Sequence, residues 1–278
     1  VGAPRDLKPV TRAEVGASWY RGDGAEAAFG AGGTRPVAAG ASLAQAVADM
    51  KAGDTLALST GTYDIAVPLT VRHRLTIAGA KDAKPVLRVA AGLARIEGGG
   101  GLQLGNLAID ASKLSGDGAL IAVDAGVAPN YSVTLDRVTV RGPGKGRLDG
   151  IAMAPGTFSD DVTITNSDFA EMGVVVAATG EQQPKGWYPM ERLTISDSRF
   201  ARVAMVADLL RKGTDESTFG PWFAMSGSSV ADSGREGASL RISGAQHANI
   251  AQNSFARSDG ILVIHSVGAP ETRIASNA

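Results

Sequence analysis

The sequence predicts an all-β protein, a right-handed parallel β-helix of about eight coils preceded by one short capping α-helix. Two observations predict this fold. Glycine accounts for 36 of the 278 residues and aromatic residues for only 5%, a composition that favours many tight turns between short strands. In addition, a pattern of apolar residues recurs about every 28 residues along most of the chain, which is the signature of a solenoid.

The first part of the chain is expected to be a lead-in followed by a helix. Residues 1–38 are rich in Gly, Ala, Arg and Pro and show no sustained hydrophobic period. The segment Ser42–Ala52 then has helical spacing, with a capping pair formed by Ser42 and Gln45. Because this helix precedes the first coil, we expect it to cover the open end of the stack, which would otherwise expose apolar side chains and unpaired strand edges.

The repeat itself predicts the stacking of the coils. Each unit has an apolar residue at a first position, often a small polar residue three positions later, and a second apolar residue five positions later. The first position is occupied by Ile77, Leu104, Leu135, Ile164, Ile195, Met225, Ile250 and Ile274. A coil of this length with short strands cannot bury its apolar side chains alone, so successive coils must stack in parallel. A β-sandwich is the alternative, but it gives no reason for so long a period.

Two further expectations follow from the repeat. Phe169, Phe200 and Phe255 share the same position on their coils, so they should stack inside one wall. The last unit begins at Ile274 and the sequence stops before that unit is complete. We therefore expect a parallel β-helix domain over residues 39–278 that is truncated at its C-terminus and belongs to a longer protein.

Composition excludes several classes of function. The net charge of −1 provides no overall basic field, so neither nucleic acid nor a membrane is expected as a partner. With no cysteine, disulfides, thiolate metal sites and cysteine nucleophiles are excluded. The glycine-rich segments lack phosphate-loop spacing, so no nucleotide-binding site is expected. The histidines lie far apart, at positions 73, 247 and 265, so no histidine pair has the spacing of a metal site.

Charge of both signs is concentrated in one segment, Asp208–Pro221. Within it, Arg211 and Lys212 could bind sugar carboxylates, while Asp215 and Glu216 could hold a hard cation such as calcium. The alternative interpretation is an ion-pair network that fixes a loop on the side of the solenoid.

Three ring-bearing residues complete the candidate substrate-binding set, together with Arg211. Trp187 and Tyr188 lie in a proline-containing insertion, where they could stack on sugar rings or cover an apolar edge. His247 is the third. Residue types alone leave both interpretations of Trp187 and Tyr188 open.

Several segments together resemble polysaccharide lyase family 6, the group of alginate lyases and chondroitinase B. They are Gly16-Ala-Ser-Trp-Tyr20, the helix leading into Gly53-Asp-Thr-Leu-Ala-Leu58, Gly61-Thr-Tyr63, Arg211-Lys-Gly-Thr-Asp-Glu-Ser-Thr-Phe-Gly-Pro221 and Leu240-Arg-Ile-Ser-Gly-Ala-Gln246. The resemblance is closest to the C-terminal β-helix of two-domain alginate lyases. In that family, β-elimination takes place on the first β-helix, with a lysine base, an arginine acid in an Arg-His-Gly strand end, and often calcium.

This chain has no Arg-His-Gly. The corresponding strand reads Leu240–Gly244, and the position of the family's arginine falls on Ile242. Arg241 would point to the other face of the strand, so the catalytic pair that the resemblance implies is incomplete. The resemblance thus implies an ancillary domain of a secreted or periplasmic lyase, which meets an anionic, alginate-like polysaccharide and an N-terminal catalytic β-helix of the same polypeptide.

Two rival hypotheses remain. The chain could be an independent lyase with Lys212 or Arg211 as base, Arg241 as acid, and Asp215 or Glu216 on calcium. It could also be a carbohydrate-binding solenoid with no chemistry of its own.

Overall fold

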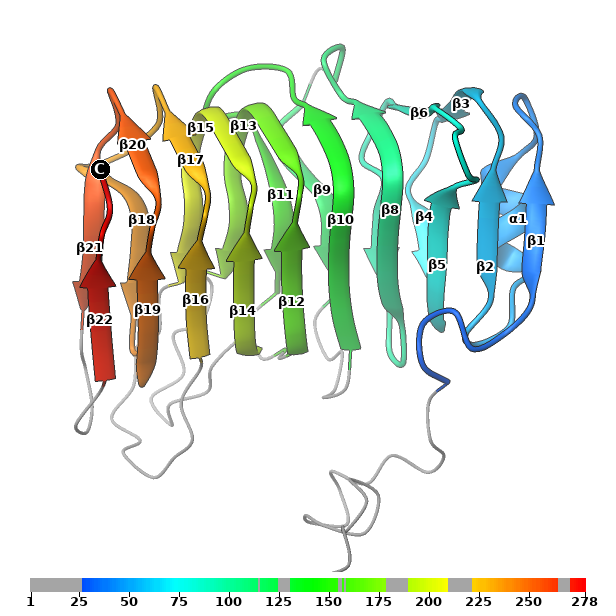
Figure 1. Cartoon of the computed structure of the whole chain (residues 1–278). Coiled ribbons are helices and arrows are strands. Elements are labelled where there is room, and N and C mark those ends of the chain that lie inside the picture. The colour runs from blue at the N-terminus through cyan, green and yellow to red at the C-terminus, as the bar shows by residue number, and fades with distance from the viewer. Residues whose placement is uncertain are drawn as a thin grey trace, which may run out of the picture.

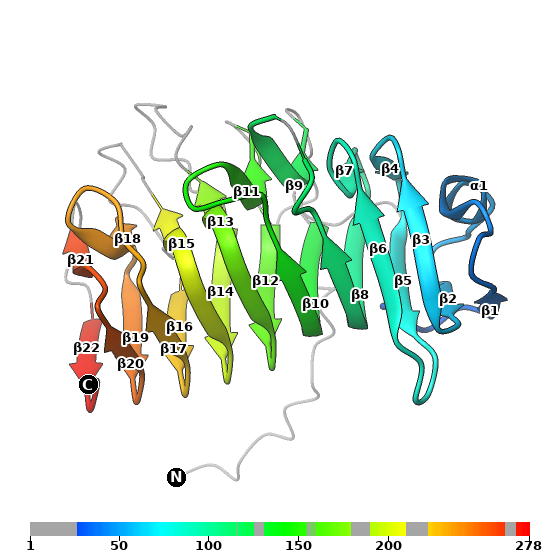
Figure 2. The same ribbon diagram turned by 90° about the horizontal axis from the view of Figure 1, so that it is seen from above.

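The computed structural model describes residues 27–114, 116–124, 131–154, 157, 159–178, 190–209, 222–264 and 271–278. Within these residues, one helix and 22 strands are present, and all strands belong to one continuous sheet. Strands of successive coils pair in parallel and form three walls, which we call walls A, B and C (Figures 1 and 2). The predicted parallel β-helix is confirmed.

Wall A is the face that Figure 1 presents to the viewer. Its ten strands pair in the order β1 (Thr34–Val37), β2 (Thr55–Leu58), β5 (Arg74–Gly79), β8 (Gly101–Asp110), β10 (Tyr131–Arg141), β12 (Ser159–Thr165), β14 (Met190–Ser196), β16 (Trp222–Ser226), β19 (His247–Ala251) and β22 (Glu271–Ala275). The strand β1 begins before the predicted domain boundary at residue 39 and pairs with β2.

Walls B and C complete each coil. Wall B consists of β3 (Gly61–Ile65), β6 (Pro85–Val89), the second parts of β8 and β10, the first parts of β13 (Asp168–Ala178) and β15 (Arg199–Leu209), β17 (Ser229–Ala231) and β20 (Ser254–Ala256). Wall C consists of β4 (Leu69–Val71), β7 (Ala94–Ile96), β9 (Gly118–Val123), β11 (Leu148–Met153), the second parts of β13 and β15, β18 (Ala238–Ser243) and β21 (Gly260–Ile264).

The predicted repeat positions coincide with the register of wall A. We call the eight first-position residues of the repeat, from Ile77 to Ile274, the marks. Each mark is the register partner of the next mark on the adjacent strand of wall A. The first seven are at most 2% exposed, because they point into the interior of the coil. In the described part of the chain, walls B and C each contain eight strand segments, in agreement with about eight coils, and wall A has one additional strand at each end, β1 and β22.

The bend from wall A to wall B follows a fixed rule. Two positions after each mark from Leu104 onward, the backbone has positive φ, at Asn106, Arg137, Asn166, Asp197, Gly227, Gln252 and Ser276. The next residue in the later coils is the predicted small polar one. Its side chain accepts a hydrogen bond from a backbone N–H of the preceding coil, at Ser167, Ser198, Ser228 and Asn253, over 3.0–3.1 Å. These side chains satisfy buried N–H groups at the bend.

The phenylalanine stack is confirmed for its first two members. The rings of Phe169 and Phe200 lie 5.5 Å apart and nearly parallel, and each side chain is 1% exposed. Phe255 occupies the same ladder position, but Val230 lies between it and Phe200, and Phe255 is only partly buried.

The capping helix is present but shorter than the predicted Ser42–Ala52. Helix α1 spans Leu43–Ala48, and the Ser42 Oγ accepts a hydrogen bond from the Gln45 backbone N–H at 3.3 Å. Its buried side chains belong to the main core, and the helix packs against β4 and β3, the first strands of walls C and B. Figure 2 shows it at that end of the stack.

Candidate functional site

The predicted site residues fall into two groups. Arg211, Lys212, Asp215 and Glu216 lie outside the described residues, as do Trp187 and Tyr188. Arg241 and His247 lie within them, on different walls of the solenoid.

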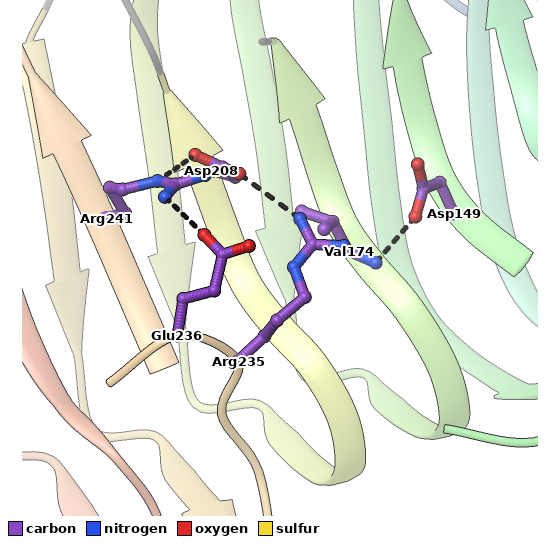
Figure 3. A network of polar contacts seen from close by, with 6 residues as sticks. All are labelled: Asp149, Val174, Asp208, Arg235, Glu236 and Arg241. Atoms are coloured by element: carbon purple, nitrogen blue, oxygen red, sulfur yellow. Dashed lines mark hydrogen bonds and ion pairs between the residues drawn. The ribbon is translucent and has the colours of Figure 1, made fainter. Parts of the chain in front are cut away.

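Arg241 lies on the outer face of wall C, directly beside Asp208. The two residues are register partners on β18 and β15, so their side chains project side by side. Arg241 donates from Nε to Asp208 Oδ1 at 2.7 Å and from Nη2 to Oδ2 at 2.6 Å (Figure 3). Asp208 is 0% exposed and Arg241 20% exposed. This bidentate geometry is the strongest arrangement available to an arginine and a carboxylate.

Two further side chains join this pair. Glu236 accepts a hydrogen bond from Arg241 Nη1 at 3.1 Å, and Arg235 approaches Asp208 Oδ2 to 3.4 Å. The hydrogen bonds with Asp208 are the main reason that the pKa of Arg241 is raised. We call Asp208, Arg235, Glu236 and Arg241 the Asp208 network. A guanidinium in this state is a weaker proton donor, and it already has a carboxylate partner.

Asp149 lies next to this network on β11. Its Oδ1 accepts a hydrogen bond from the Val174 backbone N–H at 2.7 Å (Figure 3). Burial raises the pKa of the Asp149 carboxyl, while the hydrogen bond from Val174 and the charge of Arg235 act against that rise. A small apolar cluster on the same wall, which includes Val174 and Met205, contributes to the low polarity of the region.

The sequence reasoning named Arg241 as a candidate but did not identify Asp208 as its partner. The signal was present in the repeat. Leu209 and Ile242 are inward-facing register partners, so an alignment of these apolar positions would have placed Asp208 opposite Arg241.

His247 lies on the outer face of wall A, in a ladder with Trp222 and Glu271. The imidazole stacks on the Trp222 indole with ring centres 4.2 Å apart, and its Nδ1 lies 3.4 Å from Glu271 Oε2. Trp222 is 54% exposed. It was not among the substrate-binding residues predicted from the sequence. This ladder gives His247 a defined orientation at the surface, where an imidazole can hydrogen-bond a ligand.

The described residues do not supply a calcium site. No three His, Asp or Glu side chains in the described ranges gather closely enough to hold a metal ion. The predicted calcium ligands Asp215 and Glu216 are outside these ranges. In the same part of the chain, no helix has the length and apolar character needed to cross a bilayer.

Comparison with known proteins identifies the fold. The structure is similar to that of the PL6 family alginate lyase AlyGC, with a TM-score of 0.79 and 23% identity, and to that of a variant of AlyGC, with a TM-score of 0.81 and 24% identity. Each match covers 100% of this chain and 44% of the other. No family model matches the sequence, and no curated protein does. The chain therefore has the β-helix fold of a polysaccharide lyase family 6 alginate lyase.

Proposed function

We propose that this chain is the β-helix domain of an alginate-lyase-like polysaccharide lyase, ancillary to a catalytic N-terminal β-helix of the same polypeptide. Its partner is an anionic, alginate-like polysaccharide, and its location is secreted or periplasmic. The shared fold supports this assignment, as does the fact that the chain spans less than half of the alginate lyase that it matches.

The Asp208 network is the observation that carries the ancillary role. In β-elimination on a uronate, the carboxylate charge must be neutralised before a base can remove the C5 proton. Arg241 is the described residue that the rival hypothesis uses as the acid. Its charge is balanced by a fully buried carboxylate at 2.6 Å, so turning it toward a substrate would leave Asp208 buried with only Arg235 nearby. This geometry favours a structural role for Arg241.

A direct assay separates the ancillary domain from the independent lyase. We expect the purified chain to produce no unsaturated uronate from alginate, measured by its ultraviolet absorbance, with and without added calcium. Elimination that is retained by Lys84→Ala but lost in Lys212→Ala, both folded by circular dichroism, would contradict the proposal. Such a result would place a general base in this domain, since loss of a base costs roughly 10²–10⁴-fold in rate.

One observation favours a carbohydrate-binding solenoid as the second candidate. The exposed Trp222 stacks on the partly buried His247 on wall A, and aromatic surfaces of this kind are common at binding sites. Calorimetry on the isolated chain with alginate distinguishes the two. Tight binding without elimination, unchanged when the catalytic β-helix is supplied, supports an autonomous binding module.

A further inference from the structure

A polar hollow lies on the outer face of wall A, far along the solenoid from the Asp208 network. It has a volume of about 470 Å³ and is formed where β5, β8 and β10 run side by side. Its floor is made of small residues, because Ala78 and Gly105 are register partners and neither has a long side chain. The volume lies within the range of small-molecule sites.

One rim of the hollow carries two charged side chains of opposite sign. Lys81 and Asp82 lie in the turn between β5 and β6, and both are exposed. Asp82 has a positive φ of 62°. Among the described residues, neither side chain has a hydrogen bond or an ion pair. An ammonium group and a carboxylate are therefore both available to a ligand at this rim.

The opposite rim is fixed by hydrogen bonds. Asp136 Oδ1 accepts from Thr165 Oγ1 and Asn166 Nδ2, each at 3.0 Å, while Asp136 Oδ2 lies 2.8 Å from Arg137 Nη2. These contacts balance the Asp136 charge and hold the guanidinium of Arg137, which remains 64% exposed. Because a guanidinium has five N–H donors, Arg137 keeps donors for a ligand.

Neutral hydrogen-bonding groups line the space between the two rims. Thr76 Oγ1 donates to Gln103 Oε1 at 3.2 Å, and Asn106 Nδ2 lies 3.4 Å from the Ala80 carbonyl oxygen. The amide groups of Gln103 and Asn106 offer both donors and acceptors. The hollow thus combines cations, a free carboxylate and amides around a small floor.

We propose that this hollow binds one uronate residue of a polysaccharide chain. The sugar carboxylate pairs with Lys81, with Arg137 as a second donor, and the ring hydroxyls bond to Asp82, Gln103 and Asn106. A sugar hydroxyl both donates and accepts hydrogen bonds, so the Asp82 carboxylate can accept from the hydroxyls while the cations bind the sugar carboxylate. The proposal rests on the proposed function for the identity of the polymer, but the site is distinct from the Asp208 network.

Calorimetric titration of the full chain with a short uronate oligosaccharide tests this site. At low salt we expect Lys81→Ala to weaken binding at least tenfold, because one charge-assisted hydrogen bond is lost. Gly105→Leu should abolish binding by filling the floor. The backbone accepts this change, since an added Cβ would meet Ala78 and Asp136 atoms at an ordinary 3.7 Å and the Gly105 φ is not in the positive region. Lys84→Ala is the matched control, an exposed lysine of the same turn that does not line the hollow.

The outcomes separate this inference from the proposed function. Binding by the wild type that Lys81→Ala and Gly105→Leu leave unchanged overturns the hollow alone. Absence of binding by the wild type overturns the hollow as a binding site, whereas the ancillary role is overturned only by elimination in the direct assay of the purified chain. Equal affinity for a neutral oligosaccharide of the same length, together with no effect of Lys81→Ala, overturns the assignment to a uronate. If Gly105→Leu unfolds the chain, Lys81→Ala and Gln103→Ala decide the question, since Gln103 also lines the hollow and its φ is not positive.

Discussion

The Asp208 network on wall C and the hollow on wall A use the same kinds of side chain in opposite ways. In the Asp208 network, Arg241 and Asp208 neutralise each other through two short hydrogen bonds, and Asp208 is completely buried. At the hollow, Lys81 and Asp82 are exposed and have no described partner. Residue type therefore does not separate structural charge from charge that is available to a ligand. Register and burial do.

The largest loss of stability is expected for a substitution in the buried interior, with which the effects at the two charged clusters can be compared. We expect Phe200→Ala to lower the free energy of unfolding by about 3–5 kcal/mol, because it removes a buried ring from the stack with Phe169 and leaves a cavity. Urea denaturation followed by circular dichroism measures the change. A loss below about 1 kcal/mol would mean that the coil closes the cavity or that the stack contributes little.

Arg241→Ala is expected to cost about 3 kcal/mol, since it removes both short hydrogen bonds to the buried Asp208 and leaves that carboxylate with the weaker contact to Arg235 at 3.4 Å. The matched change at the hollow, Lys81→Ala, should remain within about 0.5 kcal/mol. Removing Asp208 and Arg241 together should cost less than the sum of the single substitutions, because neither charge is then left unpaired. Equal stability of the Arg241→Ala and Lys81→Ala variants would erase the distinction between the two clusters.

These contrasts also show which parts of the molecule the sequence could predict. The core was predictable because inward positions carry apolar residues at a regular period, so marks such as Ile164 and Ile195 fall directly in register. The polar and charged side chains on the outer face of the solenoid follow no such period. Gly105 and Lys81 form one site because β5 and β8 are adjacent, although each is unremarkable in the sequence.

The candidate site was only partly predictable for the same reason. Arg241 was selected by resemblance, but its role depends on Asp208, a partner from the preceding coil. Trp222 was missed because an exposed tryptophan at the start of a strand has no local signature. Only its stacking with His247 on the next coil makes it conspicuous.

A smaller effect should separate the two carboxylates that contact Arg241. Glu236 is 67% exposed, whereas Asp208 is fully buried. We expect Glu236→Ala to cost no more than about 1 kcal/mol, as is usual for exposed ion pairs, and to lose its effect at high salt. Thermal unfolding at low and high ionic strength measures this difference. A salt-independent loss as large as that of Arg241→Ala would show that Glu236, rather than burial of Asp208, holds the Asp208 network together.

The smallest expected effect is a change in the pH dependence of stability at Asp149. Burial raises the pKa of this carboxyl above its ordinary value of 3.8, so the native state binds the proton more tightly than the unfolded state does. Stability from this group is therefore present at low pH and is lost as the pH rises from about 3.8 through the folded pKa. Asp149→Asn keeps an acceptor for the Val174 N–H but cannot ionise, so the variant should gain stability relative to the wild type over that rise.

Asp232→Asn provides a control of opposite sign for this measurement. The hydrogen bonds from Arg257 lower the pKa of Asp232, so the wild-type contribution is present at neutral pH and is lost as the pH falls through the folded value. Relative to the wild type, this variant should therefore become less stable as the pH rises. Both differences are obtained from urea unfolding between about pH 2 and pH 7, because the lowered pKa of Asp232 places its change at the acidic end of the range in which carboxyl groups titrate. If Asp149→Asn followed the same direction as Asp232→Asn, the attraction of Arg235 would outweigh burial at Asp149, and the Asp208 network would extend across β13 to include it.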